Sequence, residues 1–187
     1  MTTEDYLQSI VTRFRAILDT HGKHMGLFDE HAVQLEGWLK GELLPLFDSE
    51  KTDGRLVQFN TEVSCGYGRV DYHLIVPDDP IAVEVWLELK HFQIGRQGEY
   101  RWIASNYFTD KSIGIYRDVE KLTKIEQGDK YILVLATKNP EYEKNGDWLQ
   151  GVDKFNRKFT PLRIGSLTNP SDFPQSYFLG LLEVVRK

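Results

Sequence analysis

Hydrophobic residues near the N-terminus recur three and four positions apart, which is the spacing of one face of a helix. They are Leu7, Ile10, Val11, Phe14, Ile17 and Leu18. We therefore predict a helix that begins after Thr2 and Thr3, both of which can cap it, and that ends near Gly22. A second helical pattern covers residues 29–44 and should stop at Pro45, because proline cannot donate the hydrogen bond that a helix interior needs. The apolar face of this second helix would consist of Ala32, Leu35, Trp38, Leu39 and Leu43.

Three runs of alternating hydrophobic and polar residues follow, over residues 56–63, 69–76 and 81–92. Alternation at every second position predicts strands, and the short connections between them predict an antiparallel meander. In the middle strand, one face would consist of Val70, Tyr72, Leu74 and Val76. In the third strand, one face would carry Val83, Val85, Leu87 and Leu89. The opposite face of that strand would carry Glu84, Trp86, Glu88 and Lys90.

The second half of the chain predicts a helix over residues 110–127 and a strand over the almost wholly apolar run 131–136. Such a run is typical of a strand buried on both faces, and a strand that follows a crossover helix is normally parallel to its neighbour. A further helix over 148–155 and a terminal strand over 177–185 complete the pattern. This order predicts an α/β fold in which helices flank a central mixed β-sheet.

Composition adds limits on size and class. With 187 residues, of which 41% are hydrophobic and 27% charged, residues 1–187 should form a single globular domain. One cysteine, Cys65, argues against a disulfide scaffold or a cysteine-rich zinc module. No apolar run is long enough for a membrane span, and acidic residues stand where a secretion signal would be basic, so we expect a soluble cytoplasmic protein. The formal net charge of -5 argues against coating DNA through overall charge, yet it allows a nucleic-acid enzyme with a local acidic site.

The chemically informative residues interrupt the most hydrophobic strand. Glu88 and Lys90 are two positions apart, so they project from the same face. Burying these charges costs several kcal/mol each unless they are paired or bound to a metal, and the alternative is an ion pair on a solvated face. Asp71 lies in the preceding strand, and an antiparallel hairpin would bring it across from Glu88 and Lys90. Carboxylates at this density suit Mg²⁺ or Mn²⁺.

A helical acid is a further candidate for this site. Glu42 falls within the apolar arc of the second helix, whereas Glu36 lies at its margin. Glu42 would therefore either point into the acidic site or reach solvent near the end of the helix.

The predicted order is a helix with an acid, three strands that carry Asp71 and Glu88-Leu89-Lys90, then a helix and a buried strand. This order resembles the PD-(D/E)XK nuclease superfamily. The resemblance covers residues 29–137 and implies a restriction-endonuclease-like α-β-β-β-α-β core. The family motif carries over onto Asp71, Glu88 and Lys90, and onto Glu42 or Glu36 as the helical acid. The sequence departs from the family pattern at Val70, which stands where the motif has proline.

The resemblance implies a metal-dependent nuclease that hydrolyses phosphodiester bonds, most simply in DNA. Asp71, Glu88 and the backbone carbonyl of Leu89 would hold Mg²⁺ or Mn²⁺. Lys90 would position or help deprotonate the attacking water, and Glu42 would complete the catalytic set. Such a cation neutralises the anionic phosphodiester and lowers the pKa of a bound water. Small members of this fold often work as homodimers, so a homodimer is an expected partner state.

Basic and aromatic residues after the third strand are candidates for nucleic-acid contacts. Arg96, Arg101 and Trp102 could bind a backbone phosphate or stack on a base, or they could be incidental residues of a loop. Arg117 and Lys121 lie in the segment that is similar to the family's following helix, where a basic side chain can face the phosphate. The competing hypothesis is a non-catalytic restriction-endonuclease-like protein that serves as an immunity, inhibitor or assembly partner. An acidic surface that masks a basic partner would suit that role.

Overall fold

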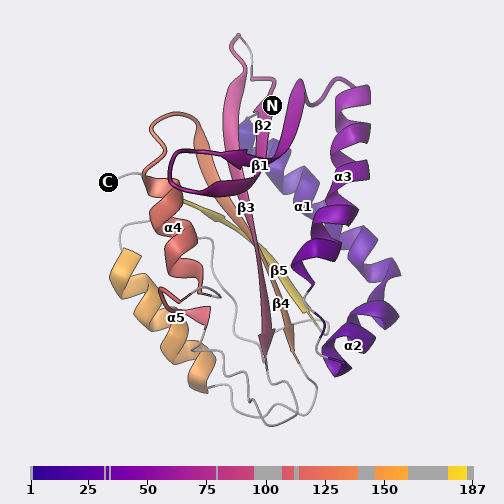
Figure 1. The fold of residues 1–187 in the computed structure, drawn as a ribbon. Helices are drawn as coiled ribbons and strands as arrows, with labels where there is room; N and C mark the ends of the chain where they lie inside the picture. The colour runs from indigo at the N-terminus through magenta and orange to yellow at the C-terminus, as the bar shows by residue number, and fades with distance from the viewer. Residues whose placement is uncertain are drawn as a thin grey trace.

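A five-stranded mixed β-sheet forms the centre of the molecule in the computed structural model, with helices on both faces (Figure 1). The structure describes residues 2–31, 33, 35–78, 80–94, 107–111, 114–138, 146–159 and 177–184. The strands are β1 (Gln58–Ser64), β2 (Arg69–Val76), β3 (Val83–Ile94), β4 (Asp129–Lys138) and β5 (Tyr177–Glu183). They lie side by side in sequence order, with β3 and β4 parallel and every other neighbouring pair antiparallel. The predicted α/β class, the meander and the parallel fourth strand are confirmed.

The helices divide between the two faces of the sheet. They are α1 (Thr3–Thr20), α2 (Gly22–Glu30), α3 (Glu36–Thr52), α4 (Ile115–Thr123) and α5 (Gly146–Phe159). The first three cover one face, and α4 and α5 cover the other (Figure 1). None of the helices within the described ranges combines the length and the apolar character needed to cross a membrane.

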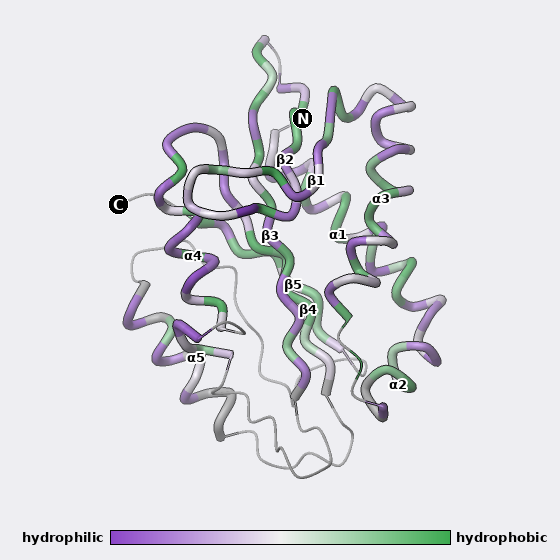
Figure 2. The backbone as a smooth tube through the Cα atoms, in the orientation of Figure 1, coloured by the Kyte–Doolittle hydropathy of each residue, from purple (hydrophilic) through white to green (hydrophobic). Residues whose placement is uncertain are grey.

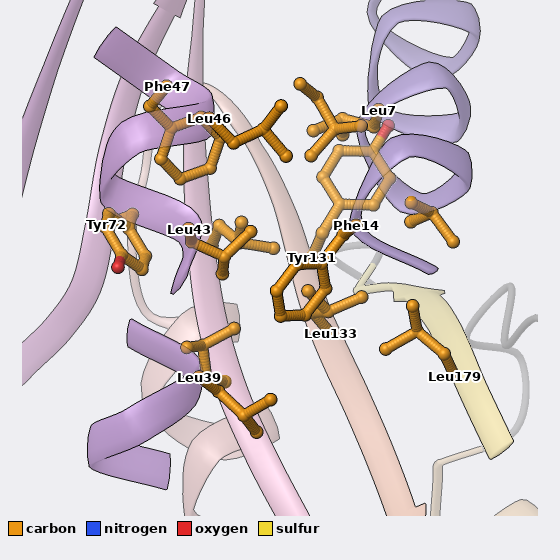
Figure 3. Close-up of a cluster of buried hydrophobic side chains, with 14 of the residues drawn as sticks. Leu7, Phe14, Leu39, Leu43, Leu46, Phe47, Tyr72, Tyr131, Leu133 and Leu179 are labelled. Atoms are coloured by element: carbon orange, nitrogen blue, oxygen red, sulfur yellow. The ribbon is translucent and has the colours of Figure 1, made fainter. Parts of the chain in front are cut away.

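The first helix packs on the sheet and begins as predicted. Thr2 caps it: its hydroxyl accepts a hydrogen bond from the backbone N–H of Asp5, whose carboxylate in turn accepts one from the backbone N–H of Thr2. These two reciprocal hydrogen bonds give acceptors to two backbone N–H groups that would otherwise have none at the start of the helix. The apolar face of α1 then meets α3 and the sheet, where Phe14 lies among Leu43, Tyr131 and Leu179 (Figure 3).

The prediction for the second helix is wrong. The structure has two helices where the sequence predicted one over residues 29–44, and Pro45 lies inside α3 rather than at its end. Pro45 is exposed, while the turns on both sides of it bury Leu43, Leu46 and Phe47. Tertiary burial of that face outweighs the local cost of a proline in the helix. Ala32, predicted for the buried face, lies outside the described residues.

The other element boundaries shift by a few residues. The helix predicted over 110–127 occupies only α4, which begins after Gly114. A side chain at that glycine would clash with the backbone oxygen of Thr109. The helix predicted over 148–155 extends further at both ends, and the last strand ends at Glu183.

Two hydrophobic cores hold the layers together. One lies between the sheet and α1–α3, and the other between the sheet and α4–α5. Figure 2 shows β4 and β5 as largely hydrophobic, as strands covered on both faces require, while hydrophilic positions interrupt β3. The two cores enclose three charged residues of β2 and β3, namely Asp71, Glu88 and Lys90.

Truncating Phe14 to alanine should lower the free energy of unfolding by about 3–5 kcal/mol. Its ring is fully buried between α1 and the sheet, so alanine would leave a cavity in the larger core. Urea denaturation monitored by circular dichroism measures the change. Gln8→Ala, at an exposed position of the same helix, should change the stability by no more than about 0.5 kcal/mol. Equal stability of Phe14→Ala and the parent would contradict the packing of α1 on the sheet.

Candidate active site

The candidate site lies where β2 and β3 stop pairing. Their ladder runs from Val76 opposite Val83 to Tyr72 opposite Leu87 and goes no further. Beyond it, a side chain replaces the missing backbone partner: Oδ2 of Asp71 accepts a hydrogen bond of 2.7 Å from the backbone N–H of Leu89. The end of the ladder thus leaves a carboxylate, instead of a carbonyl, between the two strands.

Strand β2 changes its orientation at the same place. Val70 belongs to the core under α4 and α5, whereas Tyr72 and Leu74 belong to the core under α1–α3. The expectation that these residues share one face is therefore wrong for Val70. On the neighbouring strand β1, Glu62 has a positive φ of 52°, which is uncommon and strained for a residue with a side chain. The backbone irregularities of β1 and β2 thus coincide at the acidic position.

Glu88 and Lys90 are both buried, with 8% of each residue exposed, so they do not form an ion pair on a solvated face. They also do not pair with each other. Oε1 of Glu88 accepts a hydrogen bond of 2.7 Å from Nζ of Lys121, and Nζ of Lys90 lies 3.0 Å from Oδ2 of Asp118. Both partners come from α4, which therefore supplies one opposite charge for each buried charge of β3.

The helical acid next to this network is Glu36 at the start of α3. Its Oε1 accepts a hydrogen bond of 3.2 Å from the backbone N–H of His91 and lies 3.9 Å from Nζ of Lys90. Glu42, the other candidate on this helix, has its Oε2 4.0 Å from Nε2 of His21 at the junction of α1 and α2. The structure brings Glu36 to Lys90, and it directs Glu42 toward His21 instead.

A lysine from α3 completes the cluster. Nζ of Lys40 lies 2.5 Å from Oδ1 of Asp71 and forms a second ion pair with Glu62. The hydroxyl of Tyr72 donates a hydrogen bond of 2.8 Å to the backbone oxygen of Lys40, which holds α3 against β2 at this point. Asp71 is therefore bonded on both oxygens, one to the backbone of β3 and one to α3.

Sequence reasoning missed three members of the cluster: Lys40, Glu62 and Asp118. Asp118 stands three residues before Lys121, so a shared helix face could have indicated it. Lys40 and Glu62 carry no such local signal, because the contacts that bring them to Asp71 join segments far apart in the chain.

The remaining candidates lie around or outside the cluster. Lys121, predicted as a nucleic-acid contact, is mostly buried and bonded to Glu88 and to the backbone oxygen of Arg69. Arg117 is exposed on α4. Arg96, Arg101 and Trp102 lie outside the described residues.

The surroundings of Glu88 shift the pKa of its carboxylate. Burial removes its carboxylate from water and raises its pKa from 4.5 to about 8. The negative charges of Asp71 and Asp118 add to the rise, and Lys121 offsets only part of it. Oε2 of Glu88 is buried and accepts no hydrogen bond from any residue that the structure describes. An ionised carboxylate with such an oxygen is costly, so the site favours either a proton or an added cation.

The donor set fits a small hard cation better than a soft one. The described residues contain no group of three or more histidine, cysteine, aspartate or glutamate side chains arranged to hold a metal ion. Mg²⁺, however, usually takes only one or two carboxylates from a protein and keeps several waters. Asp71 and Glu88, from adjacent strands, match that requirement, with the carbonyl of Leu89, the residue after Glu88, as an additional oxygen.

Comparison with known proteins finds no match to any family model, any curated protein or any solved structure.

Glu88 should make the metal-free protein less stable as the pH rises from about 5 to 8. Its pKa is higher in the folded state, so over this range the native state retains a proton that the unfolded chain has lost. Glu88→Gln is neutral throughout, so its stability relative to the parent should rise by more than about 1 kcal/mol between pH 5 and 8. Urea titrations in EDTA measure this difference. A constant difference across the range would contradict the raised pKa.

Proposed function

We propose that this protein is a divalent-metal-dependent nuclease that hydrolyses phosphodiester bonds in DNA. The observation that carries the proposal is the buried Oε2 of Glu88, which has no hydrogen-bond donor among the residues that the structure describes, in a carboxylate cluster beside a buried lysine. A buried carboxylate oxygen without a partner is unusual unless a proton, water or ion serves it. The chain order α3-β1-β2-β3-α4-β4 supports a restriction-endonuclease-like core, in which the resembling motif residues lie on β2 and β3.

Five residues of the cluster would have definite tasks in such a reaction. Asp71 and Glu88 would hold Mg²⁺ or Mn²⁺, which when bound supplies positive charge for the phosphodiester and lowers the pKa of a water. Lys90 would orient the attacking water or offset the charge that develops on the phosphate. Asp118 and Glu36 lie on either side of the Lys90 ammonium group and would fix its position.

Exposed basic groups near the cluster would bind the nucleic-acid backbone. Arg117 is exposed on the same short helix that supplies Asp118 and Lys121, so it is the candidate to bind a backbone phosphate at the site. Arginine at such a place binds phosphate through charge-assisted hydrogen bonds. We propose that this nuclease acts in the cytoplasm and that it forms a homodimer. Analytical ultracentrifugation measures whether the protein is a monomer or a dimer.

Purified protein should cleave duplex DNA with Mg²⁺ or Mn²⁺ and stop when EDTA is added. Glu88→Gln and Lys90→Met should each reduce the cleavage rate at least about 100-fold, because each removes a charge that the transition state requires. Single-stranded DNA and RNA, tested in parallel, establish the substrate preference. A gel assay with labelled substrates measures all of these rates.

Asp48→Asn provides the matched control, because it removes an exposed carboxylate of α3 outside the cluster. It should cleave as fast as the parent. Cleavage that persists undiminished in Glu88→Gln and Lys90→Met would overturn the assignment of the site, and circular dichroism shows whether each variant is folded.

A non-catalytic role is the second candidate, and one observation favours it. Each lysine of the cluster already has a carboxylate partner: Lys40 with Asp71, Lys90 with Asp118, and Lys121 with Glu88. Structural ion-pair networks have this character, and the protein would then act as an immunity, inhibitor or assembly partner. Absence of Mn²⁺ binding in calorimetry, together with co-purification of a basic protein, would support this role over the nuclease.

A further inference from the structure

Lys40 occupies the position from which a cation would approach Asp71. Its ammonium group lies 2.5 Å from Oδ1 of Asp71, and the remaining oxygen of that carboxylate is bonded to the backbone N–H of Leu89. The Asp71 side chain is about one-eighth exposed, and that of Lys40 is about one-third exposed. The ammonium therefore contacts one oxygen of the carboxylate, while the backbone of β3 contacts the other.

The two carboxylates that could share a metal ion differ in availability. Glu88 has an oxygen without a donor among the described residues, so it can accept a cation without losing a partner there. Asp71 has no such oxygen, because both of its oxygens are bonded. A cation that binds Oδ1 of Asp71 would share that oxygen with the ammonium group of Lys40, and the two positive charges would compete for it. The bond from Lys40 comes from a side chain and can move without disturbing the strand, whereas the bond from Leu89 comes from the backbone of β3.

Glu62 offers Lys40 a second place to bind. It already pairs with the same ammonium group, and its own side chain is about half exposed. Glu62 also has a positive φ, so the residue that contacts Lys40 has a strained backbone. If Lys40 leaves Asp71, it keeps an ion pair with Glu62 and remains charged.

We infer that Lys40 is a built-in competitor of the divalent cation, and that binding of the cation shifts Lys40 from Asp71 onto Glu62. This inference rests on the proposed function, because it assumes that Asp71 and Glu88 hold the cation. Lys40 is then a positioning residue that lowers the affinity of the site for its metal, and Glu62 is the carboxylate that makes the displacement possible. The ion pair with Lys40 also compensates the negative charge of Asp71 when no metal is bound.

Binding of Mn²⁺ to the EDTA-stripped protein of residues 1–187 tests the inference without any measurement of cleavage. Calorimetry gives the affinity, and the electron paramagnetic resonance signal of free Mn²⁺ gives an independent value. Lys40→Met should bind Mn²⁺ at least about tenfold more tightly than the parent, since it removes the competing charge-assisted bond. Lys40→Arg, which keeps the charge, and Lys51→Met, which removes an exposed lysine from the end of the same helix, should each stay within about threefold of the parent.

A double-mutant cycle separates displacement from simple charge repulsion. Glu62→Gln should weaken Mn²⁺ binding about three- to tenfold in the parent, because a displaced Lys40 then has no second carboxylate. The same substitution should have little effect in Lys40→Met, where there is no lysine to accommodate. A purely through-space effect of charge would give the same change in both backgrounds and would overturn the inference.

The outcomes distinguish this inference from the proposed function. If the parent and Lys40→Met bind Mn²⁺ equally well, the role of Lys40 is wrong while the nuclease proposal stands. If neither binds Mn²⁺, although both remain folded by circular dichroism, the metal site itself is wrong and the proposed function fails with it.

Discussion

The structure depends on the enclosure of charged side chains between two apolar layers. Glu88 and Lys90 lie in the central strand of a sheet that is covered on both faces, where an unpaired charge would cost several kcal/mol. The protein meets this cost with opposite charges from two directions. Helix α4 brings Asp118 and Lys121 to one side, and α3 brings Glu36 to the other.

The break in the β2–β3 ladder makes room for this arrangement. If backbone pairing continued past Tyr72 and Leu87, the N–H of Leu89 would have a carbonyl partner and Asp71 would have no donor from β3. Because the pairing stops, Asp71 takes the N–H and lies close enough to raise the pKa of Glu88. The irregular backbone thus brings the carboxylates of Asp71 and Glu88, from two neighbouring strands, close together.

Incomplete compensation is what separates this cluster from an ordinary ion-pair network. Three lysines and five carboxylates from Glu36, Glu62, Asp71, Glu88 and Asp118 take part, so the acids are in excess. Glu36 and Glu62 are nearly half exposed, so water can solvate their charges. Glu88 is buried, its second oxygen has no donor among the described residues, and its pKa is raised to about 8. Water would solvate that oxygen at an exposed site, whereas here the surrounding core encloses it. With no matching family, curated protein or solved structure, the functional proposal rests on this local chemistry together with the motif resemblance.

Sequence alone predicted the strands, their meander and the candidate residues Asp71, Glu88 and Lys90, because alternation and charge placement within a strand are local properties. It failed at Pro45, where burial of neighbouring residues overrides a local signal. Only the tertiary structure selected Glu36 over Glu42 and brought Lys40 to Asp71. The physical reason is that these contacts depend on how α3 docks on the sheet, and no spacing along the chain encodes the rotation of a docked helix.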